Sequence, residues 1–201
     1  MVLIGYSGHA FVVCGILNSA GLSISGYCDV SEKDFNPFNL TYFGTESSDA
    51  GIQAITQNGF FIAVGDNAVR SRIFEQFASK NLFPSNAIHS SAVIDPTADL
   101  SKAGVMVSAG VFINPLGQIG KGAICNTGCI IEHECKVGDF AHIGPGAVLC
   151  GNVTVGEKTF VGANAVIRQG IKVGRNVMIG AGAVVVKDIP DNTTVMGVPA
   201  R

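Results

Sequence analysis

A hydrophobic repeat with a period of six residues dominates the sequence between Val107 and Val185. Each sixth position holds an aliphatic residue or, once, a cysteine: Val107, Ile113, Ile119, Cys125, Ile131, Val137, Ile143, Leu149, Val155, Val161, Ile167, Val173, Ile179 and Val185. The residue after each is often glycine, and the fourth residue after each is mostly small. This period fits neither an α-helix, with about 3.6 residues per turn, nor strands joined by ordinary hairpins. It is typical of a parallel β-helix, in which three hexapeptides form one triangular coil and the coils stack.

Each position of the hexapeptide then has a physical role. The aliphatic side chain points into a narrow prism, the glycine permits a tight corner, and the small side chain fits beside its stacked neighbours. Weaker steps at Ile88, Ile94 and Leu100 precede the main run, and one extra residue lies between Leu100 and Val107. We therefore expect residues 87–201 to form the β-helix domain, which includes a short C-terminal tail.

The first 86 residues follow a different pattern, in which short apolar strands alternate with helical segments. Strands are expected at 2–4, 24–28 and 60–64, and helices at 11–21, 50–56 and 69–77, with a fourth short strand ending near Ile88. Strands that alternate with helices predict a parallel sheet with crossover helices. Residues 1–86 are therefore expected to form a small α/β domain of the Rossmann-like type.

The composition excludes several classes of function. Thirteen basic and fifteen acidic residues among 201 give no electrostatic reason to expect nucleic acid or an anionic membrane as a partner. No apolar run approaches the length of a membrane span, and the first residues lack the basic leader of a signal peptide, so we expect a cytoplasmic protein. The six cysteines include no Cys-x-x-Cys pair, which favours buried, reduced thiols over a metal or redox site.

Candidate ligand-binding residues of the first domain lie where its strands end. Gly5-Tyr6-Ser7-Gly8-His9 occupies the first strand-to-helix turn, where backbone N–H groups can bind phosphate. The Gly-x-Gly-x-x-Gly pattern of dinucleotide redox domains is not met. Asp29 and Gly65-Asp66-Asn67 end the second and third strands at the same edge of the sheet, where ligands of such folds bind. A tight turn and a solvated carboxylate are the alternative interpretations, and we favour phosphate or nucleotide binding.

Glu132-His133-Glu134 stands out in the repeat, where charged residues are otherwise scarce. A carboxylate that is hydrogen-bonded to one imidazole nitrogen fixes the tautomer and raises the basicity of the other nitrogen. The alternative is an exposed polar corner of a coil. His142 lies nine residues on, half of an eighteen-residue coil, so the two histidines would meet most simply across a subunit interface. Asn126 is equally well a corner residue or a ligand contact.

A metal site is not expected. A γ-type carbonic anhydrase would use a β-helix with three zinc-binding histidines, whereas the main repeat here supplies only His133 and His142.

Several motifs together resemble a known family. They are Ile4-Gly5-Tyr6-Ser7-Gly8-His9, Ala63-Val64-Gly65-Asp66-Asn67 with Arg70, Asn126-Thr127, Ile131-Glu132-His133-Glu134, Cys150-Gly151-Asn152-Val153 and Val195-Met196-Gly197-Val198-Pro199-Ala200. The sequence is similar to the bacterial sugar O- and N-acyltransferases, which include UDP-4-amino-sugar N-acetyltransferases of bacillosamine synthesis and sialic acid O-acetyltransferases. The resemblance covers nearly the whole chain, and it implies a left-handed β-helix, acetyl-CoA as donor and a homotrimer.

The resemblance also implies roles for individual residues. His133 matches the catalytic base, Glu134 the acid that supports it, and His142 a residue near the acetyl thioester. The other matched active-site positions are Glu132 and Asn126. The positions that match the nucleotide-sugar pocket are His9, Asp29, Gly65 and Asp66, and those that match backbone contacts to coenzyme A are Gly151, Ala163 and Ala181.

The expected function is acetyl-CoA-dependent N-acetylation of a nucleotide-linked amino sugar, of the UDP-4-amino-4,6-dideoxy type, in the synthesis of a surface glycan or glycoprotein. The amine would attack the thioester directly, because no serine or cysteine has an evident nucleophile setting. One alternative is O-acetylation of sialic acid or another sugar. A second is a nucleotide-sugar-binding solenoid without activity, against which the intact Glu132-His133-Glu134 argues.

Overall fold

Three parallel strands form the sheet of the N-terminal unit in a computed structural model that describes residues 1–201. β1 (Val2–Ile4) lies between β2 (Gly26–Cys28) and β3 (Phe60–Ile62). Side chains of these strands alternate between two buried clusters, so both faces of the sheet are covered. Leu3 packs in the cluster with α1 (Gly8–Ser19), and Ile4 in the one with α2 (Asp49–Asn58) and α3 (Asn67–Ala78). The predicted Rossmann-like α/β arrangement is confirmed.

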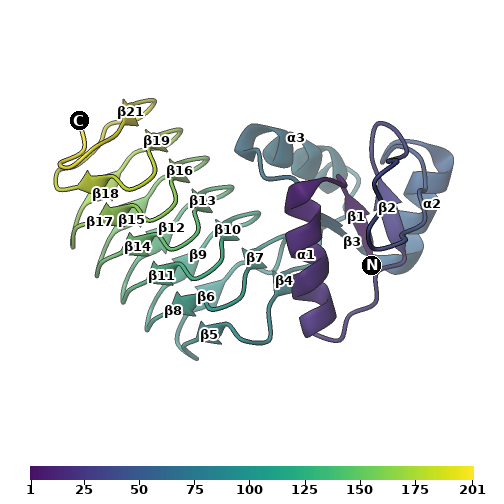
Figure 1. The fold of residues 1–201 in the computed structure, drawn as a ribbon, viewed down its shortest axis with the longest axis horizontal. Coiled ribbons are helices and arrows are strands. Elements are labelled where there is room, and N and C mark those ends of the chain that lie inside the picture. Colours follow the sequence, from purple (N-terminus) through teal and green to yellow (C-terminus); the bar gives the residue numbers. More distant parts are fainter.

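The remaining strands wind into a triangular solenoid with three parallel sheets, which we call faces 1, 2 and 3 (Figure 1). Face 1 comprises β4 (Ala87–Ile88), β7 (Met106–Val107), β10 (Ile124–Cys125), β13 (His142–Ile143), β16 (Phe160–Val161), β19 (Met178–Ile179) and β21 (Thr194–Val195). Face 2 comprises β5 (Val93–Ile94), β8 (Phe112–Ile113), β11 (Ile130–Ile131), β14 (Val148–Leu149), β17 (Val166–Ile167) and β20 (Val184–Val185). Face 3 comprises β6 (Asp99–Leu100), β9 (Gln118–Ile119), β12 (Lys136–Val137), β15 (Thr154–Val155) and β18 (Lys172–Val173).

The six-residue repeat builds the interior of this solenoid. All of its positions between Val107 and Val185 belong to one cluster of 27 buried hydrophobic residues. Each inward residue stacks on the equivalent residue one coil away; Cys125, for example, lies in register with Val107 and Ile143. The predicted left-handed parallel β-helix is therefore confirmed. All six cysteines are unpaired thiols, and five of them are buried.

The expected fourth strand of the N-terminal sheet belongs instead to the solenoid. Ala87 and Ile88 pair with Met106 and Val107 in face 1, and the N-terminal sheet ends at three strands. The amide groups of Ala87 and His89 donate to the carbonyl oxygens of residues in the next coil, 2.9 Å away. Ile88 packs against the solenoid core, so it satisfies the first step of the hexapeptide repeat.

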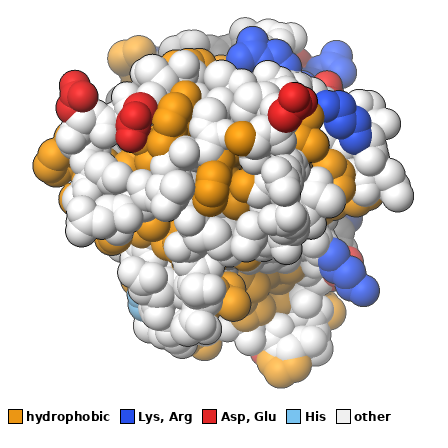
Figure 2. Space-filling view, turned by 90° about the vertical axis from the view of Figure 1, so that its right-hand side faces the viewer, with side chains coloured by type: hydrophobic (Ala, Val, Ile, Leu, Met, Phe, Trp, Pro, Cys, Tyr) orange, Lys and Arg blue, Asp and Glu red, His pale blue; other side chains and the backbone are white.

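Two apolar contacts help to fasten the N-terminal unit to the solenoid. Helix α1 covers the first coils of face 1, where Ala87, Met106 and Ile124 are buried with it in one cluster. Phe140, at a solenoid corner, packs edge-on against Phe74 of α3 with ring centroids 5.3 Å apart. The C-terminus lies at the far end of the solenoid (Figure 1). On the end of the molecule that carries the N-terminal unit, charged side chains are few and scattered (Figure 2). No helix is both long and apolar enough to cross a bilayer.

Gly162→Ala should destabilise the solenoid, because a Cβ atom there would lie 2.5 Å from the amide nitrogen of Ala181 in the next coil. Crowding of this kind costs about 1–3 kcal/mol in the free energy of unfolding. Gly15→Ala in α1 is the matched control, since its Cβ would meet no atom within 4 Å. Alanine in a helix interior adds about 1 kcal/mol of stability over glycine. Urea unfolding of both variants measures the two effects, and equal stabilities would contradict the close stacking of coils.

Candidate active site

A cleft of about 670 Å³ lies between the start of α3 and the outer surface of face 1. Its N-terminal wall is Gly65-Asp66-Asn67, and its solenoid wall includes His142, Phe160 and Met178. These three side chains stand at the same register position of successive coils. The cleft therefore brings the end of β3 against the outward-facing histidine of β13.

His142 is a buried imidazole whose surroundings keep it neutral. Only 7% of the residue is exposed, and its ring packs edge-on against Phe160, with centroids 4.9 Å apart. Burial, followed by the charges of Arg70 and His9, lowers the pKa of His142 from 6.5 to about 3, which the nearby Gly65 backbone opposes only in part. The side-chain nitrogen of Asn126 lies 3.0 Å from Nε2 of His142. Because an amide nitrogen donates, Nε2 accepts and the ring proton is carried by Nδ1.

His9 stands next to this ring, in the first turn of α1. The two imidazole centroids are 6.3 Å apart, and the ring of His9 lies against Gly65. Its Nε2 atom is buried without a hydrogen-bond partner. Burial, with a smaller contribution from the charge of Arg70, lowers the pKa of His9 from 6.5 to about 4. Two neutral histidines thus face each other at the junction of the N-terminal unit and the solenoid.

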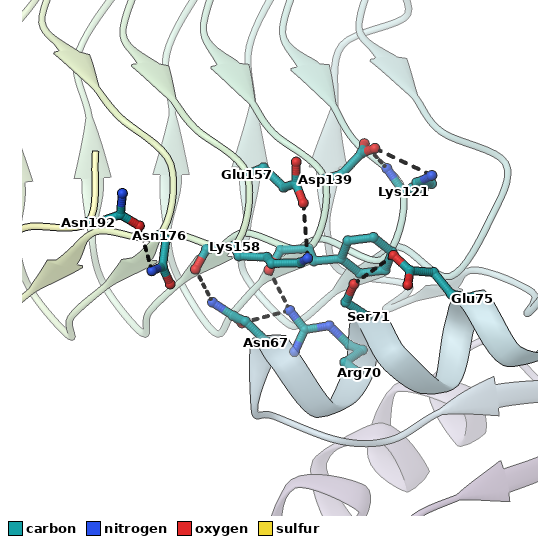
Figure 3. Close-up of polar contacts among 11 residues, drawn as sticks. Asn67, Arg70, Ser71, Glu75, Lys121, Asp139, Glu157, Lys158, Asn176 and Asn192 are labelled. Carbon is teal, nitrogen blue, oxygen red and sulfur yellow. Dashed lines mark hydrogen bonds and ion pairs between the residues drawn. The ribbon is translucent and has the colours of Figure 1, made fainter. Parts of the chain in front are cut away.

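Arg70 is a buried cation that holds this junction together. Its guanidinium donates to the carbonyl oxygens of Val64 and Gly65 in the N-terminal unit at 3.0 and 2.9 Å. It also donates to the carbonyl oxygens of Gly122 and Phe140 in the solenoid at 2.8 and 2.9 Å. A further bond reaches Oδ1 of Asn67, whose Nδ2 donates to the carbonyl of Lys158 (Figure 3). No carboxylate pairs with this cation, so its positive charge acts on the neighbouring histidines.

A second cavity, of about 410 Å³, lies at the carboxyl edge of the N-terminal sheet. It contains the turn from Gly5 to Ser7 and shares Gly65 and Asp66 with the cleft. Asp66 caps α3, because its Oδ1 accepts from the amide of Val69. Ser7, by contrast, makes no side-chain cap at the start of α1, so first-turn N–H groups remain available.

Asp29 is engaged within this turn. Its Oδ2 atom accepts from the amide of Tyr6 at 2.8 Å, and its Oδ1 atom accepts from the amide of Val30 at 2.7 Å. Lys33 forms an ion pair with the same Oδ1 at 3.0 Å. Asp29 thus fixes the shape of the first strand-to-helix turn as well as lining the cavity.

His133 lies at a different corner of the solenoid, between faces 2 and 3. Half of its side chain is exposed, and Nδ1 lies 3.1 Å from a carboxylate oxygen of Glu134. The ring covers Gly151 of the next coil, where a Cβ atom would come within 2.5 Å of Nε2. Glu132 precedes it at the same corner and is half-buried. Unlike His142, this histidine is open to solvent, and the carboxylate of Glu134 lies beside its Nδ1 atom.

The structure places the predicted site residues of the cleft and the solenoid corners in three groups within one chain. His9, Gly65, Asp66, Asn126 and His142 gather around the cleft and its junction with the second cavity. Glu132, His133, Glu134 and Gly151 share the corner between faces 2 and 3. Ala163 and Ala181 stack at the corner between faces 1 and 2, where the amide of Gly182 donates to the carbonyl of Ala163.

Sequence reasoning missed Arg70 and Phe160 as parts of the site. Arg70 belongs to one of the motifs that resemble the family, but nothing in a sequence distinguishes a buried arginine from a solvated one on a helix. Phe160 could have been found from its spacing, because it lies eighteen residues, one coil, after His142. No three His, Cys, Asp or Glu side chains are grouped closely enough to hold a metal ion.

Comparison with known proteins identifies the family of this chain. The PglD N-terminal domain family matches residues 1–77, and the bacterial transferase hexapeptide family (six repeats) matches residues 152–187. The solved structure of PerB from Caulobacter crescentus, in complex with CoA and GDP-perosamine, is 37% identical. It is covered over 95% of its length by the whole of this chain, with a TM-score of 0.90. The chain belongs to the left-handed β-helix family of sugar acyltransferases.

A second relative of this family is the acetyltransferase domain of PglB from Neisseria gonorrhoeae FA1090, solved with acetyl coenzyme A. It is 31% identical, with 97% of that chain and 100% of this chain covered and a TM-score of 0.87. A third match is a variant of the Caulobacter crescentus perosamine N-acetyltransferase in which one histidine is replaced by asparagine. It is 36% identical, with 94% of that chain and 100% of this chain covered and a TM-score of 0.92. The predicted family and the prediction of an acyltransferase are confirmed.

Acid should destabilise the protein through the two neutral histidines. Since their pKa values in the folded state, about 3 and about 4, lie below 6.5, the unfolded chain binds protons first as the pH falls. The free energy of unfolding should therefore decrease between pH 7 and pH 5, by about 2 kcal/mol for each histidine. Urea unfolding of wild type and His142→Gln measures this contribution. An identical pH dependence in both proteins would contradict a neutral His142.

Proposed function

We propose that this protein transfers the acetyl group of acetyl-CoA to the amino group of a nucleotide-linked amino sugar. The observation that carries the proposal is that the cavity of the N-terminal sheet and the cleft at His142 are neighbours, which share Gly65 and Asp66 as lining residues. Two relatives, one solved with CoA and GDP-perosamine and the other with acetyl coenzyme A, support the same pairing of donor and acceptor. We propose the cytoplasm as the place of the reaction, as expected from the sequence.

The acceptor would bind with its nucleotide in the N-terminal domain, for which we propose residues 1–86. Its phosphates would lie at the turn from Gly5 to Gly8, where α1 starts without a side-chain cap. The sugar would then cross Gly65, whose missing side chain leaves room beside His9. This path leads the amino group toward the solenoid domain, residues 87–201, and the outer surface of face 1.

His133 is the base in this proposal. The amine nitrogen attacks the carbonyl carbon of the thioester, the C–N bond forms, and its proton passes to Nε2 of His133. Glu134 on Nδ1 holds the ring and stabilises the imidazolium that forms. Collapse of the tetrahedral intermediate breaks the C–S bond, and the leaving CoA thiolate takes the proton from Nε2 of His133, which becomes neutral again. His142 is unsuited to this role, because its pKa is lowered to about 3 and its Nε2 already accepts from Asn126.

Asn126 and His142 instead stabilise the oxyanion that develops on the thioester oxygen. His142 holds one hydrogen of the Asn126 amide, and the oxygen of that amide accepts from the amide of Thr127 at 2.8 Å. The second amide hydrogen then points in a set direction and can be donated to the substrate. Backbone groups at Gly151, Ala163 and Ala181 would line the path of the pantetheine arm.

The site needs two chains, because His133 and His142 leave different sides of the prism. Face 2 carries an uncovered apolar stripe of outward side chains, formed by Val93, Phe112, Ile130, Val148, Val166 and Val184. The equivalent positions of face 3 are polar, and the first coils of face 1 are covered by α1. An apolar stripe of this kind requires cover. We place it at the centre of a homotrimer, in which His133 of one subunit faces the cleft of the next.

The catalytic assignment predicts a specific loss in His133→Ala. Release of CoA from acetyl-CoA, measured with nucleotide-linked 4-amino sugars, should fall in kcat by about 10²–10⁴-fold, since a positioned base contributes that factor. KM for acetyl-CoA should stay nearly constant.

Glu134→Ala should lower kcat by a smaller factor, because Glu134 only orients the ring. Thermal stability should not change, since Ile131 is the inward residue there. Full turnover in His133→Ala, together with an inactive His142→Ala, would show that the base is His142 and not His133. Nucleotide sugars with a hydroxyl group in place of the amine are the acceptor control.

The trimer predicts different outcomes for the same charge on two faces. Val148→Lys places an ammonium in the apolar stripe of face 2 and should give monomers in light scattering. Thr154→Lys, one hexapeptide later on polar face 3, should stay trimeric. A monomeric wild-type protein would overturn the proposed assembly.

The shared site can be tested separately by subunit mixing. Inactive His133→Ala and inactive His142→Ala chains, assembled together in equal amounts, should regain activity, since about a quarter of the interfaces would combine both intact residues. A mixture without activity would show that each chain uses its own two histidines.

A further inference from the structure

The cavity at the carboxyl edge of the N-terminal sheet carries two opposite charges that no protein group neutralises. Glu46 and Arg72 both line this cavity of about 410 Å³. Neither takes part in any of the five ion pairs of the structure. The other two acids of the cavity are engaged within the protein. Asp29 accepts from two amides and pairs with Lys33, and Asp66 caps α3 by accepting from the amide of Val69. Glu46 is therefore the carboxylate that remains available for a ligand.

Glu46 is positioned by an ordered turn. It follows Thr45, whose carbonyl oxygen accepts from both the amide and the hydroxyl of Ser48 at 3.1 and 2.8 Å. Ser48 in turn caps α2 through the amide of Gly51. Glu46 is half-buried, and its charge reaches the thiol of Cys28 at the end of β2, where it adds to the burial that raises the pKa of that thiol to about 11. The amide of Asp29 donates to the carbonyl oxygen of Gly44 at 3.2 Å, so the segment that carries Glu46 lies beside the end of β2.

Arg72 reaches the cavity from another element. It lies on α3, six residues after Asp66, which caps the helix and also lines the cavity. The Glu46 carboxylate approaches the cavity from the turn before α2, and the Arg72 guanidinium approaches it from α3. Because the two groups do not pair, they offer two acceptors and a fork of donors to a planar ligand.

The edges of the nucleobases differ in how well they match this pair. Guanine has two adjacent donors, N1–H and the 2-amino group, which a carboxylate accepts together, and two acceptors, O6 and N7, which a guanidinium binds as a fork. Uracil and thymine have one N–H between two carbonyl oxygens, and a carboxylate placed there meets a like partial charge. Adenine and cytosine place a ring acceptor beside their single amino donor, which excludes a second bond to a carboxylate.

We propose that Glu46 and Arg72 select a guanine nucleotide, so that the acceptor is a GDP-linked rather than a UDP-linked amino sugar. This inference rests on the proposed function and differs from the UDP type expected from the sequence. Glu46 accepts from N1–H and the 2-amino group, and Arg72 donates to O6 and N7. The phosphates then extend toward the turn from Gly5 to Gly8, which borders the same cavity.

Titration calorimetry of the full chain with GDP, IDP, UDP, dTDP and ADP tests the selection. GDP should bind at least about tenfold more tightly than the others, because a lost hydrogen bond to a charged group costs that factor or more. IDP, which lacks only the 2-amino group, is the matched ligand. Glu46→Gln should weaken GDP binding by about ten- to a hundredfold and leave UDP binding unchanged. Glu32→Gln, an exposed acid outside the cavity, should bind GDP as wild type does.

Equal affinities for GDP and UDP, or an unchanged GDP affinity in Glu46→Gln, would overturn the inference. Acetyl transfer separates this failure from a failure of the proposed function. Transfer to a UDP-linked but not a GDP-linked 4-amino sugar would overturn the guanine assignment alone. Transfer to neither class, in a folded protein that binds GDP, would overturn the proposed acetylation and leave the guanine site supported.

Discussion

The eighteen-residue coil is the constraint on which the rest of this protein depends. Every inward side chain has one neighbour above and one below, as Cys125 has in Val107 and Ile143, so the period cannot drift without losing the core. Because the period is rigid, the direction of each outward residue follows from its number. Residues nine positions apart, such as His133 and His142, leave the prism on different sides. A site that uses both histidines must therefore be assembled from two chains.

The N-terminal unit places a buried positive charge, that of Arg70, against this scaffold. Arg70 donates to the carbonyl oxygens of Gly65 in the N-terminal unit and Phe140 in the solenoid, and it has no carboxylate partner. A buried cation satisfied only by carbonyl oxygens leaves its charge to act on its surroundings. His9 and His142 stay neutral beside it, so the protein holds two imidazoles of contrasting character in the proposed site. The buried one positions Asn126, and the exposed one, next to Glu134, is free to accept a proton.

In the proposed function, the cavity recognises the substrate and the cleft carries out the chemistry. Nucleotide recognition would fall to Glu46, on the turn before α2, and Arg72, on α3, which can vary without disturbing a core. The proposed reacting groups lie on solenoid coils, whose backbones are hydrogen-bonded to neighbouring coils. Gly65 and Asp66 border both spaces, so a change at the end of β3 would affect nucleotide and thioester together.

The sequence by itself determined the solenoid, because a six-residue period of inward aliphatic residues has one structural solution. It also indicated the Rossmann-like unit and the residues around His133, because their motifs are short and continuous in the sequence. Tertiary structure alone decided the rest. Ile88 fitted both a sheet strand and a hexapeptide, and only its hydrogen bonds to the next coil assigned it. The burial of Arg70, the pairing of Asn126 with His142 and the unpaired charges of Glu46 and Arg72 depend on contacts between distant segments. A pKa, in particular, is set by solvent access and neighbouring charge, and neither can be read from the order of residues.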